Sequence, residues 1–203
     1  MADHRAIMAV AESVVNLLRS SYRPADFNVD LEFRTFTARD FSTNAIANGV
    51  SLFLYRVFPF GTVRTPPGRL DSLGRRLRGP LPVELHFLLT VWAKEASLQH
   101  AILGWMMRTL EDSPILPAGA LNAAAEGSFR ADELVDVSLA ELTNEDLLRI
   151  WEVLGLHVYQ VSVPYIARAV LIESVHRRAA TGGPVQERAQ DVGVLQMPEA
   201  LVT

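Results

Sequence analysis

Residues 81–93, Leu-Pro-Val-Glu-Leu-His-Phe-Leu-Leu-Thr-Val-Trp-Ala, form the most apolar stretch of the chain. Alternate side chains of a strand point to the same face, and every second residue here is a large apolar one, so the pattern predicts a long strand over residues 83–93. Its apolar face carries Val83, Leu85, Phe87, Leu89 and Val91. The opposite face begins with Glu84 and His86, which predicts a polar outer surface.

Other segments predict the strands that would surround this one. Residues 50–58 are apolar on both faces, which is typical of an inner strand. Val29, Leu31 and Phe33 alternate with charged residues, as in a half-buried strand. Further predicted strands cover residues 134–139, 159–163 and 165–175, with Pro164 breaking the last two apart.

Three amphipathic helices are predicted between these strands. The first spans about residues 4–20 with Asp3 as its N-cap, and the second spans about residues 96–111. The third follows Thr143, which with Asp146 resembles a capping box, and ends at Gly155. Its predicted apolar stripe consists of Leu147, Leu148, Trp151 and Leu154. We expect residues 37–49 and 113–128 to be loops.

The order of these elements is not the strict strand–helix alternation of a doubly wound fold. It favours a single α+β domain, with a mostly antiparallel or mixed sheet covered by about three helices on one face. We expect this domain to occupy residues 1–175. Beyond it the apolar pattern dissolves, so residues 176–203 are predicted to be an arm that is extended or disordered when unassembled.

Composition and charge exclude several classes of protein. The 203 residues include no cysteine, which excludes a disulfide framework, a thiolate metal site and a cysteine nucleophile. With 19 basic and 23 acidic side chains the net charge is −4, which argues against gripping a nucleic-acid backbone with the whole surface. Residues 1–18 lack the uninterrupted apolar run of an export signal, so we expect assembly in the cytoplasm.

The segment between the strands at 50–58 and 83–93 is unusual. Residues 59–82 hold five prolines, four glycines and five arginines against a single acid, Asp71. Long connections without apolar periodicity are usually functional or mobile loops, so this one is either a partner site or a solvated excursion. Because the chain is acidic overall and few aromatic residues accompany the arginines, an acidic protein surface is a better partner than nucleic acid.

A search for catalytic motifs finds no phosphate-binding loop, dinucleotide fingerprint, zinc-protease helix or nucleophile elbow. No two of the five histidines stand at ligand spacing, so neither a metal nor another cofactor is predicted. His86 beside Glu84 has the arrangement of a base and its orienting carboxylate, but no nucleophile accompanies the pair. Trp92, Trp105 and Trp151 lie among apolar residues, which favours core or interface positions over a platform for stacking bases. We predict no catalytic site, and therefore no enzyme.

Four segments in this order nevertheless resemble a known family. They are residues 50–57, 81–93, 102–114 (which end in the turn Glu-Asp-Ser-Pro) and 151–174. Together they resemble the cap, or tail-terminator, family of contractile injection systems, which are phage-tail-like particles. The resemblance extends over about residues 5–175. The arginine-rich loop and the residues after Val175 match no pattern of that family.

The resemblance implies a structural role. Members of the family are thought to form a six-fold ring at the distal end of the particle, where they end the inner tube and the contractile sheath. The implied partners are therefore sheath subunits, tube subunits and further copies of the chain in a hexameric ring, with no membrane contact of its own. Stacked tube and sheath layers always expose an unmatched interface, which a terminator must match on one side only.

Three contact modes are consistent with this role. A sheet edge accepts a strand from a sheath subunit, the arginines contact acidic tube or neighbour surfaces, and the 176–203 arm orders on assembly. The predicted partner-contact residues are Arg64, Arg69, Arg75, Arg76, Arg78, Arg177 and Arg178. The competing hypothesis is a nucleic-acid-associated or head–tail connector protein that uses the same arginines on DNA.

Overall fold

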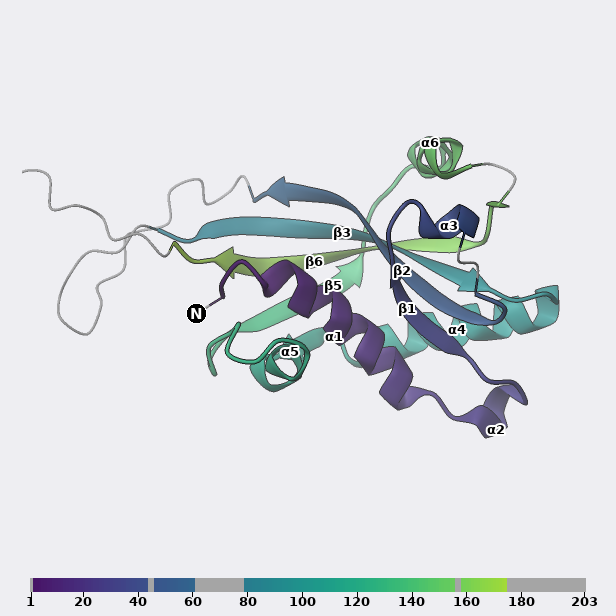
Figure 1. The fold of residues 1–203 in the computed structure, drawn as a ribbon, viewed down its shortest axis with the longest axis horizontal. Helices are drawn as coiled ribbons and strands as arrows, with labels where there is room; N and C mark the ends of the chain where they lie inside the picture. Colours follow the sequence, from purple (N-terminus) through teal and green to yellow (C-terminus); the bar gives the residue numbers. More distant parts are fainter. Residues whose placement is uncertain (1, 44–45, 61–78, 156–157, 175–203) are drawn as a thin grey trace, which may run out of the picture.

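The computed structural model describes residues 2–43, 46–60, 79–155 and 158–174. These residues form six helices and one mixed sheet of six strands. Figure 1 shows how these elements are arranged in space. The strands are β1 (Glu32–Phe36), β2 (Gly49–Pro59), β3 (Leu81–Trp92), β4 (Ile115–Pro117), β5 (Leu134–Leu139) and β6 (Ser162–Ile172). The helices are α1 (Ala6–Ser21), α2 (Pro24–Phe27), α3 (Asp40–Thr43), α4 (Ala96–Asp112), α5 (Ala118–Ala124) and α6 (Asn144–Leu154).

The strand order is β1-β2-β3-β6-β5-β4, and only the β1–β2 pair is parallel. The predicted α+β class and mostly antiparallel sheet are therefore confirmed, with β2 and β3 inside the sheet. Gly49 is required where β2 begins, because a Cβ built there would lie 2.0 Å from the carbonyl oxygen of Glu32, at a φ of +148°. The parallel pairing of β1 with β2 depends on that close approach.

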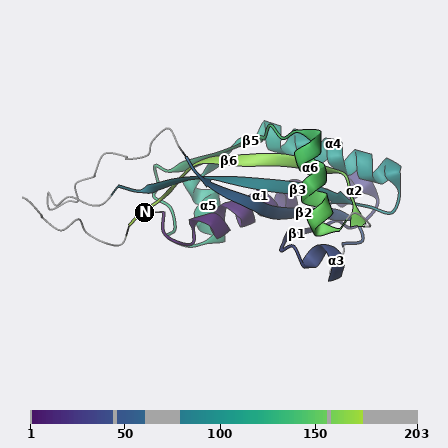
Figure 2. The same ribbon diagram turned by 90° about the horizontal axis from the view of Figure 1, so that it is seen from above.

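Helices cover both faces of the sheet, so the prediction that they cover one face is wrong. α1, α4 and α5 pack on the face that carries Phe87 and Leu89 of β3, here called the inner face. α3 and α6 pack on the outer face, where Phe41 and Trp151 meet Leu88. Figure 2 shows α6 in front of the strands and α1 and α5 behind them.

The three long helices are confirmed, with small differences at their ends. α1 begins at Ala6, two residues later than predicted, because residues 4–5 form a separate turn. Asp3 caps that turn by accepting a hydrogen bond from the Arg5 N–H at 2.8 Å. Burial opposes ionisation of Asp3, but the hydrogen bonds and charge of Arg5 outweigh it and lower its pKa. α6 begins as predicted, since the Thr143 hydroxyl accepts from the Asp146 N–H at 3.1 Å.

Two predicted loops contain regular structure. Residues 113–128 hold β4 and α5, whose alanines and Leu121 pack closely against α1. Small residues at this contact bury little side-chain surface each, which is why the apolar periodicity of the segment is weak. Residues 37–49 hold α3, and its Phe41 is buried in the outer-face core.

Two strand predictions are wrong in their limits. The first strand covers residues 32–36 rather than 29–34. It extends to Phe36, which packs in the outer-face core, whereas Phe33 packs in the inner-face core. Parts of the segments predicted at 159–163 and 165–175 form one strand, β6 (Ser162–Ile172), which runs through Pro164. Residues 159–161 and 173–174 lie outside it, and residue 175 lies outside the described residues. The Pro164 carbonyl accepts from the Ala140 N–H, on the side of β6 away from β3. Its nitrogen lies on that same side, so the pairing with β3 loses no donor.

Candidate interaction surface

All seven arginines predicted to contact partners lie outside the described residues, in residues 61–78 and 175–203. The structure does describe the residues on both sides of 61–78 and the residues that precede 175–203. The Phe60 N–H donates to the Pro82 carbonyl at 3.0 Å, so residues 61–78 connect the two strands of the β2–β3 hairpin. Ile172 at the end of β6 pairs with Leu81. Both segments are therefore attached to the same end of the sheet, at the left of Figure 1.

That end of the sheet is anchored to the rest of the fold beside α1. The Glu173 N–H donates to the Ala2 carbonyl at 2.8 Å, and the Glu173 carboxylate pairs with Arg130. The side chains of Arg130 and Glu173 are both largely buried. Because a largely buried ion pair resists separation better than an exposed one, the chain after β6 is held in place as far as Glu173.

Beyond α3 and α6, the outer face presents polar side chains. Arg56 of β2 is paired with His86 of β3, and Arg168 of β6 lies 3.5 Å from Glu84. The predicted polar outer face is therefore found only at this end of the sheet, because Leu88 and Trp92 on the same face of β3 are buried under α3 and α6. Burial lowers the pKa of His86, as do the charges of Arg56 and Arg168, while Glu84 acts in the opposite direction.

Two β-bulges lie beside this polar region. Tyr55 is an extra residue in β2, between the pairs formed by Leu54 and Arg56. β6 has an extra residue opposite Glu84, and Ala169 there adopts a φ of 65°. The left-handed backbone conformation is energetically unfavourable for an alanine. Each bulge also increases the local twist of its strand. The Tyr55 ring lies beside the His86 ring on the outer face, with centroids 5.9 Å apart.

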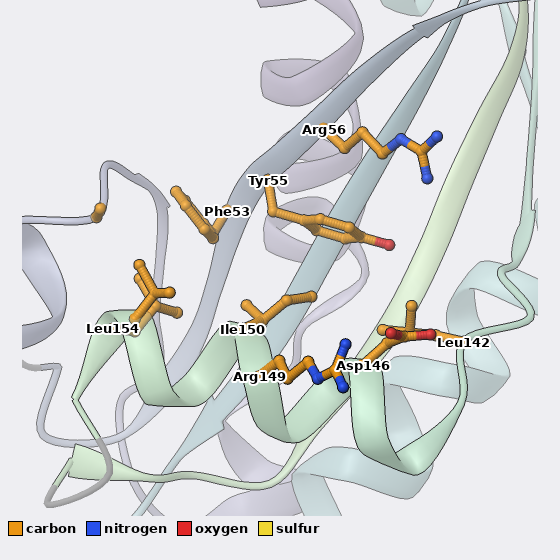
Figure 3. A pocket seen from close by; sticks show the side chains of 10 residues that line it. Phe53, Tyr55, Arg56, Leu142, Asp146, Arg149, Ile150 and Leu154 are labelled. Carbon is orange, nitrogen blue, oxygen red and sulfur yellow. The ribbon is translucent and has the colours of Figure 1, made fainter.

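A groove of about 490 Å³ lies between β2 and α6 on the outer face, and Figure 3 shows its side chains. Its lining residues are Ala38, Phe53, Tyr55, Arg56, Leu142, Asp146, Arg149, Ile150, Val153 and Leu154. Burial raises the pKa of Tyr55, partly against the charge of Arg56, and Asp146 adds to the rise. The floor of the groove is apolar, and the charged side chains of Arg56, Asp146 and Arg149 lie at its rim.

Sequence reasoning missed this groove, although α6 carried a signal for it. Leu148, predicted to be part of the buried stripe, is 49% exposed, and Ile150 packs against the outer-face core instead. Val153 is 87% exposed. A helix of eleven residues with apolar side chains on more than one stripe has more apolar surface than one core contact can bury.

Two of the three tryptophans lie in the core, one of the two settings that the sequence predicted, and the third packs against it. Trp92 and Trp151 are buried on the outer face, and the Trp92 indole N–H donates to the Ser51 hydroxyl at 2.8 Å. Trp105 of α4 packs edge-on against Phe27 and beside Phe33. Within the described residues, no group of three histidine, aspartate or glutamate side chains is placed to hold a metal ion.

The two edges of the sheet differ in the hydrogen-bonding groups they offer. At β4, Pro114 and Pro117 lack N–H groups, so this three-residue edge offers few donors. At β1, the Glu32 N–H donates inward to Asn48, so Phe33 and Thr35 direct their backbone groups outward. The Phe33 carbonyl already accepts from Arg19 at 2.8 Å. Thr35 retains outward-facing backbone groups.

The model of one protein family, the Pvc16 N-terminal domain, matches residues 9–187. The chain belongs to this family. The match covers most of the chain and includes both sheet faces, the hairpin and the groove. The matched range contains almost all of residues 5–175, over which the sequence resembles a known family.

Two solved structures share the fold of this Pvc16 N-terminal domain chain. One is the sheath/tube terminator of PVC, an extracellular contractile injection system, in its extended state, with 17% identity and a TM-score of 0.62 over 96% of this chain. The other is the tube-terminating cap of the anti-feeding prophage, with 17% identity and a TM-score of 0.60 over 90% of this chain. This chain spans 65% and 60% of those two chains. No curated protein matches it.

None of the helices in the described residues combines the length and the apolar character needed to cross a membrane.

Proposed function

We propose that the chain is a structural cap that ends the inner tube and the sheath of a contractile injection system at its distal end. The observation that carries this proposal is the family match over residues 9–187, supported by a fold that both terminator structures share. We propose assembly in the cytoplasm as a hexameric ring with sheath and tube subunits as partners and no catalytic role.

The arrangement of the sheet supports a role in which one end makes the contacts. The arginine-rich segment and the 176–203 arm are both attached to the end of the sheet where Pro59 and Ile172 lie. We propose that Arg64, Arg69, Arg75, Arg76, Arg78, Arg177 and Arg178 contact acidic surfaces of neighbouring subunits from this end. Guanidinium groups suit such contacts because each can bind a carboxylate through two parallel hydrogen bonds.

Strand addition is the second proposed contact, and it favours the β1 edge. A strand from a sheath subunit needs donors and acceptors in alternation, which Thr35 offers and the proline-flanked β4 edge does not. Arg19 occupies the Phe33 carbonyl, so an incoming strand pairs beyond that residue or displaces the guanidinium.

Deletion of the gene followed by electron microscopy of purified particles tests the capping role. We expect particles that are missing, unstable or variable in length, with bare distal ends, because uncapped layers keep an unmatched interface. Complementation with the intact gene should restore a uniform length. Particles of normal length with an intact cap would show that the proposal is wrong.

Charge reversal tests the arginine-rich segment separately. The triple variant Arg75→Glu, Arg76→Glu, Arg78→Glu should fold normally but lose most co-purification with particles. A control with the same charge change, Arg23→Glu, Arg39→Glu, Arg108→Glu, alters exposed arginines elsewhere and should keep it. If the two variants co-purify with particles equally well, the arginine-rich segment is not part of the interface.

A further inference from the structure

The groove between β2 and α6 is lined by apolar side chains that pack against the outer-face core on one side and are partly open to solvent on the other. Its floor is formed by Phe53, Tyr55, Ile150 and Leu154, and Val153 at its rim is 87% exposed. A volume of about 490 Å³ lies within the range of sites that enclose several side chains of a ligand. Contiguous exposed apolar surface of this kind usually marks an interaction site.

The charge at the rim limits what can bind. Within the described residues Arg56 has no carboxylate partner, and its guanidinium lies 4.6 Å from the centre of the Phe58 ring. Arg149, on the other side of the floor in Figure 3, is paired with Glu145 at 2.5 Å. His86, paired with Arg56 across the strands, has a pKa lowered by burial and then by Arg56. Asp146, the other charged lining residue, accepts a hydrogen bond from the Thr143 hydroxyl at 2.7 Å. Arg56 is therefore the unpaired positive charge beside the groove, and an occupant with apolar side chains and a carboxylate that reaches Arg56 fits it.

One segment of the same chain has this chemistry. Residues 189–203 read Ala-Gln-Asp-Val-Gly-Val-Leu-Gln-Met-Pro-Glu-Ala-Leu-Val-Thr, with six large apolar side chains and neither lysine nor arginine. Asp191 and Glu199 stand on either side of the apolar run 192–197. The pattern does not predict a helix or strand that would form a core of its own.

The segment is also within reach. β6 ends in register with Leu81, and the groove residue Phe53 is in register with Leu88, seven residues along β3. This separation corresponds to about 23 Å along a strand. Residues 175–191 span up to about 60 Å when extended. A tether of this length supplies a local concentration on the order of millimolar, which a separate partner would have to exceed.

We propose that residues 189–203 bind in the groove of their own chain, with the apolar run 192–197 on its floor and a carboxylate of Asp191 or Glu199 on Arg56. In this arrangement the chain covers its own exposed apolar surface. The inference goes beyond the capping role and does not depend on it, because it concerns the isolated chain.

Disulfide trapping tests the proposal in the full 203-residue chain, which has no native cysteine to interfere. The variant Val153→Cys, Leu195→Cys is oxidised at low protein concentration, and the intrachain disulfide is detected by mass spectrometry and non-reducing electrophoresis. The control Ala101→Cys, Leu195→Cys places the first thiol on an exposed position of α4, which packs on the inner face. We expect the groove pair to close on the order of tenfold faster than the control pair.

A charge swap makes the test specific for Arg56. Arg56→Glu in the groove-pair background should slow closure, and Asp191→Arg with Glu199→Arg should restore it. Circular dichroism verifies that each variant is folded. Equal closure rates for the groove and control pairs would overturn the proposal, and so would a disulfide that forms mainly between two chains. Either result leaves the particle-length experiment unaffected.

Discussion

The inner and outer faces of the sheet share the strand β3 but are built differently. On the inner face, alternate residues from Val83 to Val91 are buried along the whole strand under α1, α4 and α5. On the outer face, Leu88 and Trp92 are buried under α3 and α6, whereas Glu84 and His86 are partly exposed. The inner face therefore supplies most of the stability, and the outer face leaves surface for contacts.

The largest expected difference between the faces is at two adjacent residues. Phe87→Ala removes a fully buried ring from the inner core and should cost about 3–5 kcal/mol of unfolding free energy, since the cavity cannot collapse fully. His86→Ala, on the same strand but the opposite face, should cost less than about 1 kcal/mol. Denaturant unfolding of both variants measures the difference. Similar losses would mean that the outer face near the hairpin is as important for stability as the inner core.

The inner face was also the easier one to predict from sequence. Its strands and the long helices α1 and α4 carry strong apolar periodicity, because each buries one face against a continuous core. α5 and β4 were missed because alanines and prolines make tight contacts without large apolar side chains. The run through Pro164 was missed because local propensity does not reveal on which side of a strand a donor is needed.

The outer face was harder to predict because it combines distant segments. Phe41 from a segment predicted as a loop, Phe36 from β1 and Trp151 from α6 make one core, and no local pattern links them. The groove needs the same assembly, together with the bulge at Tyr55 that the register of β2 and β3 creates. The arginines of 59–82 were visible in sequence as a cluster. Their role stays a prediction, as do the limits 1–175 and 176–203.

A smaller effect separates α6 from the helices of the inner face. Thr143→Ala removes the hydroxyl that accepts from the Asp146 N–H and should cost about 1 kcal/mol. Thr143→Ser keeps the hydroxyl and is the matched control. Hydrogen exchange should show increased opening of α6 in the alanine variant with α1 and α4 little changed, because α6 packs only on the smaller outer core. Uniform loss of protection in all three helices would mean that the outer face does not open separately.

The smallest effect concerns the titration of the outer face. Burial and the charge of Arg56 lower the pKa of His86 below its ordinary value, whereas Glu84 opposes the shift. The folded state therefore binds this proton less readily than the unfolded state, so the contribution of His86 to stability is full above pH 6.5. It declines as the pH falls from there through the folded-state pKa.

Removing the nearby charge should reduce this effect. Arg56→Ala should raise the pKa of His86 and lessen the stability lost between neutral and mildly acidic pH. NMR titration of the His86 ring resonances follows the pKa, and denaturant unfolding at several pH values follows the stability. Arg149→Ala removes an equal charge that does not act on His86, and should leave its titration unchanged. If both variants shift His86 equally, general surface charge rather than the Arg56–His86 pairing governs the outer face. The Arg56 contact proposed for Asp191 or Glu199 would then lose its electrostatic basis.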